Sequence, residues 1–397
     1  MSRHAVWHRL YPVLVVLSTL VAEVHAQAAD PALVSDGGSG KQILSAPRTI
    51  LDQAAARGFS FQLSFVNDWS KVPDRDKDAD GGFGRYSLDL SLTVDGAKTI
   101  GWSGTTAFIR LKNHINEFGD TYDDEAQLYS NIDGISRTTL YELWMEHKLL
   151  PWLQVKGGKM DASADFASVA TGTDFLNSSM GFSPTIMSFP SYPEPQPGIA
   201  AFFQPSEKYT AKVAAFRTTN AGTLTLIEPG YAWSRGVNGL PGHINAGYWR
   251  LFASLPNFRS GVSSFSQGYY LVSEQSLWQQ NLRNKAVRDV SGFLQLGHGN
   301  AAVSPITDHV GTGLVLRAPF EQRSKDAVGM GATWVRFSDD PVAGYDRNAE
   351  LIPESYYKFS LTNKVAVVED FQLLHHPGGM KAYEDCPVIT SRLAISF

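Results

Sequence analysis

The stretch that decides the fold reads Tyr86-Ser87-Leu88-Asp89-Leu90-Ser91-Leu92-Thr93-Val94 and is followed by Asp95-Gly96. Apolar and polar side chains alternate along it, so every second residue faces the same way when the backbone is extended. Such a strand has one apolar face and one polar face. Asp-Gly is a favoured tight turn between antiparallel strands. The segment therefore predicts a half-buried strand that opens a hairpin.

The same alternation recurs along the chain, for example over residues 59–65, 107–111, 357–361 and 391–397. The segments are about ten residues long, which is the length that a tilted strand needs to cross a bilayer. Sixteen such segments begin near Phe59, Arg85, Trp102, Arg137, Trp152, Gly198, Tyr209, Ile227, His243, Gln267, Val290, Asp308, Ala327, Glu354, Val365 and Val388. An even number of strands is typical of a closed transmembrane barrel.

The connections between these segments alternate between short and long, for example 95–96 and 150–151 against 114–136 and 161–197. Outer-membrane barrels have short periplasmic turns and long extracellular loops. We therefore predict an all-β fold, a transmembrane antiparallel up-and-down β-barrel of sixteen strands. A soluble β-sandwich or propeller also alternates, but aromatic residues at the strand ends and charged residues on the polar faces favour the membrane barrel.

The N-terminus predicts a targeting segment. A basic start at Arg3 and Arg9 precedes twelve mostly apolar residues and then small residues near Ala26 and Ala28, as in a secretory signal peptide. We assign residues 1–28 to this signal. Residues 29–57 are predicted as a periplasmic segment with a short helix over 47–57, and residues 58–397 as the barrel.

The composition excludes several classes of function. The 397 residues carry 34 Lys+Arg against 39 Asp+Glu, so there is no basic field for a nucleic acid. Cys386 is the one cysteine, which rules out a disulfide framework and a multi-cysteine metal site. The phosphate-loop, nucleophile-elbow and zinc-protease motifs do not occur, and we expect neither a cofactor nor an enzyme.

Several motifs together resemble the carbohydrate-selective porins of the OprB type. They are Gly158-Lys159-Met160-Asp161-Ala162, Phe175 to Gly181, Pro184-Thr185, Pro190 to Pro193, Tyr141-Glu142-Leu143-Trp144, Tyr270-Leu271-Val272 with Glu274-Gln275 and Leu277-Trp278, and Phe371 to Gly379. The resemblance spans about residues 47–397. It implies a sixteen-stranded barrel in the bacterial outer membrane that passes sugars down their gradient, usually as a monomer among the membrane lipids.

A sugar pore needs hydrogen-bonding groups for hydroxyls and aromatic surfaces for the C–H faces of the ring, all on the inward side of the strands. The candidates for this lumen set are Arg110, Lys112, Glu142, Trp144, Glu146, Trp233, Arg235, Tyr248, Arg250, Glu274, Trp278, Lys358 and Arg392. Many of them could instead pair with one another along a wide, wet lumen. On the eighth strand, the run Ile227-Glu228-Pro229 leaves open whether an acid faces inward.

The segment 161–197 is the best candidate to fold inward and narrow the bore, because it is too apolar for a fully solvated loop; an external lid is the alternative. Residues 76–81 have the acidic spacing of a calcium loop, but Ser87 occupies the position of its glutamate. His375 and His376 could bind metal, yet neighbours on a strand point to opposite faces. We therefore predict no metal site.

Three functions are compatible with such a barrel. The first is passive diffusion of glucose-like monosaccharides or small oligosaccharides, the second is a porin for anions or small organic acids, and the third is an outer-membrane hydrolase. Glu142, Glu146 and Glu274 would repel anions, which favours neutral solutes. Nothing in the sequence brings Ser, His and an acid together, which argues against the hydrolase.

Overall fold

The computed structural model describes residues 50–72, 83–116, 125–219, 222–259 and 261–397. The chain divides into two units, Met1–Gln53 and Ala54–Phe397, and every described strand belongs to the second unit. Residues 50–56 are helical, inside the segment 47–57 for which the sequence predicts a helix. The predicted signal peptide and the acidic run 76–81 lie outside the described residues.

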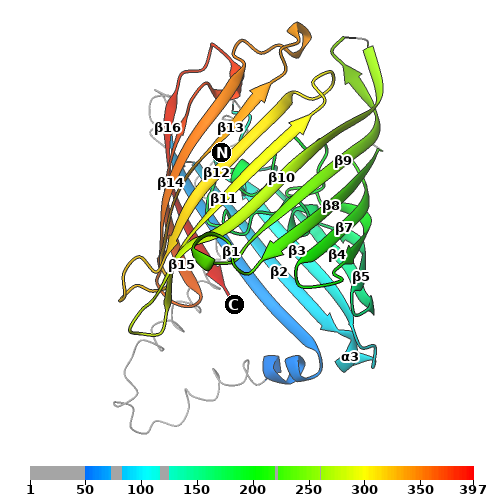
Figure 1. Cartoon of the computed structure of the whole chain (residues 1–397), viewed down its shortest axis with the longest axis vertical. Helices are drawn as coiled ribbons and strands as arrows, with labels where there is room; N and C mark the ends of the chain where they lie inside the picture. Colours follow the sequence, from blue (N-terminus) through cyan, green and yellow to red (C-terminus); the bar gives the residue numbers. More distant parts are fainter. Residues whose placement is uncertain (1–49, 73–82, 117–124, 220–221, 260) are drawn as a thin grey trace, which may run out of the picture. The chain divides into compact units, whose positions relative to one another are not determined.

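Sixteen antiparallel strands form a closed barrel in chain order, and the last strand pairs with the first (Figure 1). They are β1 (Phe59–Lys71), β2 (Phe83–Asp95), β3 (Thr105–Asn116), β4 (Arg137–Leu150), β5 (Leu153–Met160), β6 (Gln196–Phe203), β7 (Tyr209–Arg217), β8 (Thr223–Trp233), β9 (Gly242–Asn257), β10 (Gly261–Asn281), β11 (Val287–Gly299), β12 (Ile306–Arg317), β13 (Ala327–Phe337), β14 (Ala349–Ser360), β15 (Val365–Leu374) and β16 (Cys386–Ser396). Short helical turns in the described chain are α3 (Gly96–Thr99) and the 3₁₀ turns η1 (Ala162–Ala164), η2 (Ser178–Met180), η3 (Val237–Gly239), η4 (Pro341–Ala343) and η5 (Pro377–Gly379).

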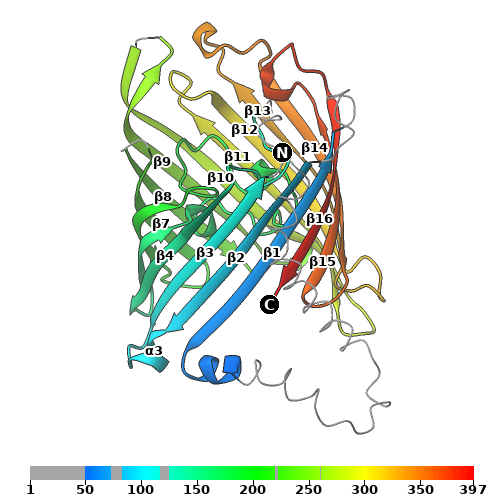
Figure 2. The ribbon, with the colours of Figure 1, turned by 180° about the vertical axis from the view of Figure 1, so that it is seen from behind.

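Strands β1 and β16 close the barrel, as Figure 2 shows from behind. Leu63 and Phe397 exchange two backbone hydrogen bonds of 3.1 and 2.9 Å, and Arg392 of β16 donates to the buried Asp68 of β1 at 2.6 Å. Each of the sixteen segments predicted from alternation begins inside the matching strand or at most three residues before it. The predicted all-β, sixteen-strand barrel is confirmed.

The two rims of the barrel differ. The connections 96–104, 151–152, 204–208, 234–241, 282–286, 318–326 and 361–364 lie at one rim, together with Phe397; we call it the turn end. The opposite rim, the loop end, carries the longer described segments 125–136, 161–195, 338–348 and 375–385, along with shorter ones such as 300–305. Long connections therefore gather at the loop end, although not all connections there are long.

Alternation sets the two faces of the wall. On β2, Arg85 and Ser87 face inward and are 2% exposed, whereas Leu90 faces outward and is 47% exposed. Large aromatic side chains stand on the outer surface near both rims, including Trp69 and Tyr269 toward the loop end and Trp152 toward the turn end. An outer apolar band between aromatic girdles is the surface that a bilayer requires.

Gly158 on β5 allows the backbone of β5 to lie close to Trp144 of the neighbouring strand β4. Its φ is +137°, and a Cβ there would overlap the carbonyl oxygen of Leu143 and lie 2.6 Å from the Trp144 Cα. We expect Gly158→Ala to destabilise the barrel by about 1–3 kcal/mol, because it combines backbone strain with a clash. Urea unfolding of the lipid-reconstituted protein measures this.

Gly157 provides the control for this prediction. The neighbouring glycine has an ordinary φ, and the nearest atom to its added Cβ is the Gly198 carbonyl oxygen at 3.9 Å. Gly157→Ala should leave stability unchanged. Equal effects of the two substitutions would contradict the prediction.

Candidate functional site

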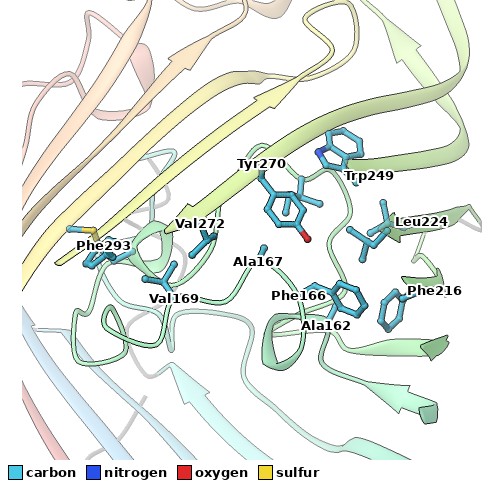
Figure 3. Packing of buried hydrophobic residues seen from close by; sticks show 14 of the residues in the cluster. Ala162, Phe166, Ala167, Val169, Phe216, Leu224, Trp249, Tyr270, Val272 and Phe293 are labelled. Atoms are coloured by element: carbon cyan, nitrogen blue, oxygen red, sulfur yellow. The ribbon is translucent and has the colours of Figure 1, made fainter. Parts of the chain in front are cut away.

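The segment 161–195 leaves β5 at the loop end and folds into the barrel. Phe166 packs edge-on against Phe216 of β7 at 6.4 Å, and Phe175 packs edge-on against Tyr356 of β14 at 4.9 Å between ring centroids. Figure 3 shows the contacts of this segment with the wall, where apolar residues from β7 to β11 form one buried cluster with it. The inward path is the one that the sequence favours over an external lid.

Three wall glutamates hold the backbone of this segment. The Ala167 N–H donates to Glu228 of β8 at 2.8 Å, and the N–H groups of Ala170 and Thr171 donate to the two oxygens of Glu274 on β10. Farther along, the Leu176 and Asn177 N–H groups donate to Glu354 of β14 at 2.5 and 3.2 Å. Hydrogen bonds to a carboxylate are the strong ones, so these residues fix the segment across the lumen.

A second loop, residues 125–136, is held in the same way at the loop end. The Ala126 and Gln127 N–H groups both donate to Glu350 of β14 at 2.9 Å. Tyr129 accepts from Arg85 at 2.7 Å. Burial raises the pKa of the Tyr129 phenol well above its ordinary value, so it stays protonated at neutral pH.

A group of side chains on the inner faces of β3, β4 and β5 is partly exposed to the lumen. Phe108 of β3 and Trp144 of β4 stack with centroids 4.9 Å apart. Arg110 lies 5.2 Å from the Phe108 ring and 35% of its side chain is exposed, while the Lys156 ammonium lies 4.1 Å from the Trp144 ring. Because these residues face inward, their partial exposure is exposure to the pore. We call Phe108, Arg110, Glu142, Trp144 and Lys156 the aromatic–cation strip.

The cations of the pore are paired with acids. Arg110 lies 3.3 Å from Glu142, Lys156 bonds Asp165 of the inserted segment at 2.7 Å, and Lys358 of β14 bonds Asp174 of the same segment at 2.6 Å. Asp165 and Asp174 therefore connect the segment to opposite parts of the wall. The pairs leave little net charge but many donors and acceptors.

A family model for the carbohydrate-selective porin, OprB family, matches residues 84–397. This chain belongs to that family. Porin B of Pseudomonas aeruginosa is 23% identical over 403 residues, which cover 86% of this chain and 88% of that protein.

Solved structures share the fold. The high-pH structure of Pseudomonas putida OprB superposes with a TM-score of 0.78 at 20% identity, covering 89% of this chain and 97% of that one. The low-pH structure of the same protein gives 0.59 at 18% identity, covering 92% and 100%. Because it belongs to the carbohydrate-selective porin family, this porin is an outer-membrane channel for carbohydrates, and the predicted family, function and location are confirmed.

Eight of the thirteen residues predicted for the lumen face inward in this porin. They are Arg110, Lys112, Glu142, Trp144, Glu146, Glu274, Lys358 and Arg392. They are not equivalent. Lys112 is buried against Asp89 at 2.8 Å, Arg392 closes the seam with Asp68, and Glu274 holds the inserted segment. Among these eight residues, those around Trp144 combine cations and acids with half-buried aromatic rings.

For the other five residues the lumen prediction is wrong. Tyr248 and Arg250 lie on the outer face of β9, and the Arg250 guanidinium covers the outer Phe265 ring at 4.3 Å. Trp233 shares the outer face of β8 with Ile227, and Arg235 lies in the exposed turn 234–241. Trp278 pairs with the outward Val290.

Two physical causes explain these errors. The inserted segment makes the inner wall of β7 to β10 apolar, with Trp249 and Leu251 inward and fully buried, so polarity no longer marks the lumen there. At β10, a bulge between Ser276 and Trp278 reverses the alternation. The structure also answers the question left open on β8, because Glu228 faces inward and is 1% exposed.

Six lumen or anchoring residues were not predicted from the sequence: Phe108, Lys156, Asp165, Asp174, Glu228 and Glu354. Lys156 stands in a glycine-rich strand, where the period is weak, although its place two residues before Gly158 could have identified its face. Asp165 and Asp174 lie in a loop, where the sequence shows no alternation of apolar and polar residues that would predict the direction of their side chains. Their partners are set only by the fold.

Within the described residues, the group of His, Cys, Asp and Glu able to hold a metal ion is His375, His376 and Asp385 at the loop end. None of the described helices is long and apolar enough to cross a membrane.

Proposed function

We propose that the aromatic–cation strip is where this porin recognises carbohydrate during passive diffusion. The observation that carries this proposal is the stacked Phe108–Trp144 pair, bordered by Arg110 and Lys156. A pyranose has apolar C–H faces and a hydroxyl edge. An aromatic surface matches the faces, while a planar guanidinium and a carboxylate match vicinal hydroxyls.

The pairing of charges supports neutral solutes over anions. Arg110, Lys156 and Lys358 each have a carboxylate partner, so an anion would meet an acid beside every one of these cations. Paired groups still offer directional hydrogen bonds across the lumen. The other inward-facing residues predicted from the sequence would hold the aromatic–cation strip in place or line the pore at other heights. They are Lys112, Glu146, Glu274 and Arg392.

The remaining assignments are also proposals. Residues 1–28 would be the export signal and residues 29–57 a periplasmic segment. The outer apolar band supports direct contact with membrane lipid, and we propose a monomer that acts only as a channel. Light scattering of the purified protein tests the oligomeric state.

Single-channel recording with a glucose or maltose titration tests the proposed site. We expect sugar to block the ion current, and Arg110→Ala to weaken the block about tenfold, since charged hydrogen bonds contribute about 1.5–3 kcal/mol. Arg336→Ala is the matched control, because Arg336 also pairs with an acid, Asp308, but on the outer face.

The outcomes separate the candidate functions. A channel that ignores sugars but selects anions would move the assignment to the second porin class. Equal sugar block in wild type and Arg110→Ala would place recognition elsewhere in the lumen.

A further inference from the structure

We propose that His375, His376 and Asp385 form a binding site for a transition-metal dication such as Zn²⁺, Ni²⁺ or Cu²⁺ at the loop end of β15 and β16. One donor atom from each residue lies within 4.8 Å of the other two. The site is separate from the sugar path described above. It rests on how the hairpin brings these three side chains together.

Strand pairing places the acid opposite the first histidine. The last paired residues of β15 and β16 are Leu374 and Cys386, so His375 and Asp385 are the next residues on each side. The His375 Nδ1 contacts Asp385 Oδ2, and the His376 N–H donates to Asp385 Oδ1 at 2.9 Å. The carboxylate therefore stands beside both histidines.

The backbone of His376 brings its ring to the same side. Its φ and ψ are 57° and 56°, which is the left-handed region. Neighbouring histidines point to opposite faces only on extended backbone, and here the two imidazole rings stack with centroids 3.9 Å apart. The reason given from sequence against a metal site does not apply to this conformation.

The turn that follows is held from two sides. The Gly378 N–H donates to Glu350 at 2.6 Å, and the Arg347 N–H donates to the Gly379 carbonyl at 2.7 Å. His375 also exchanges two backbone hydrogen bonds with Leu351 of β14. The donors are thus presented by a fixed backbone, which lowers the entropy cost of binding an ion.

The donor set selects the class of ion. Two imidazoles and one carboxylate suit zinc, nickel or copper, whereas calcium and magnesium prefer oxygen donors alone. About 43% of the His375 side chain and 45% of the Asp385 side chain are exposed, so an ion and completing waters can reach them. Small rotations would bring the nitrogens to the metal–ligand distance of about 2.0–2.1 Å.

Titration of the full-length, untagged protein with Ni²⁺ or Zn²⁺ in a calorimeter tests the site. We expect one equivalent to bind, and His376→Ala or Asp385→Asn to weaken binding at least about tenfold, since even loss of an outer-shell partner of a ligand costs about 10–100-fold in metal affinity. The single-channel conductance of each variant reports that the barrel is intact.

His298→Ala is the matched control. His298 also bonds an acid, Asp308, at 2.7 Å on the exposed surface, but no second histidine joins that pair. Its substitution should leave metal binding unchanged. In the Cu²⁺ complex, electron paramagnetic resonance should detect two coordinated imidazole nitrogens, and one in His376→Ala. No binding by the wild type, or equal binding by His376→Ala and wild type, would overturn the proposal.

Discussion

Replacing Glu354 by alanine is expected to enlarge the pore and to abolish most of its block by sugar. Glu354 is fully buried among wall and loop residues and accepts the N–H groups of Leu176 and Asn177, in the middle of the inserted segment. Each of these hydrogen bonds contributes about 0.5–1.5 kcal/mol. Losing both bonds, about 1–3 kcal/mol together, shifts the equilibrium between the docked and the released segment by about five- to a hundredfold.

The measurement is single-channel conductance together with sugar block in the same membrane. Glu354→Gln is the control variant, because its amide oxygen can still accept from the loop N–H groups and its NH₂ group can donate to Asp370, which hydrogen-bonds Glu354 in the wild type. We expect higher and noisier current for alanine and nearly normal current for glutamine. Unchanged conductance in Glu354→Ala would mean that the apolar contacts alone hold the segment.

Replacing Trp144 by alanine is the second large effect that we expect, here on sugar affinity. The Trp144 indole stacks on Phe108, lies under the Lys156 ammonium and donates to Glu142 at 3.1 Å. Trp144→Ala removes the largest aromatic ring of the aromatic–cation strip. Phe108, Lys156 and Glu142 then lose their contacts with that ring. A loss of about 1–1.5 kcal/mol corresponds to about five- to tenfold weaker block.

Two comparisons sharpen this second test. Trp144→Phe keeps an aromatic face and should retain part of the affinity. Trp152→Ala removes an indole from the outer surface near the turn end, where the ring is 45% exposed, and should not change sugar block. The strip would lose its proposed role if the Trp144→Ala and Trp152→Ala channels gave the same sugar titration as wild type.

Much of the fold could be predicted because the two faces of a transmembrane strand differ in polarity. Along β2, every outward residue from Tyr86 to Val94 is apolar, so alternation alone located the strand and its two faces. The same rule placed Arg110 and Trp144 correctly. It works wherever the inner face meets water and the outer face meets lipid.

The rule fails where the chain fills its own lumen. Trp249 and Leu251 face inward because the inserted segment covers them, and their polar neighbour Arg250 faces outward. A single added residue beside Trp278 has the same effect on parity. The anchors could not be foreseen either, because a carboxylate such as Glu228 binds backbone N–H groups of a segment some sixty positions away, and backbone groups leave no mark in a sequence.

The way the inserted segment is held gives the bore two unlike sides. One side is the strand wall around Trp144, whose geometry is set by the hydrogen-bond ladder of the whole barrel. The other is a length of irregular backbone attached at a few acids, among them Glu228 and Glu354. Substitutions at those acids could change the width of the pore while the pairing of the strands stays the same. Solute size preference can therefore diverge between related channels without cost to assembly of the barrel.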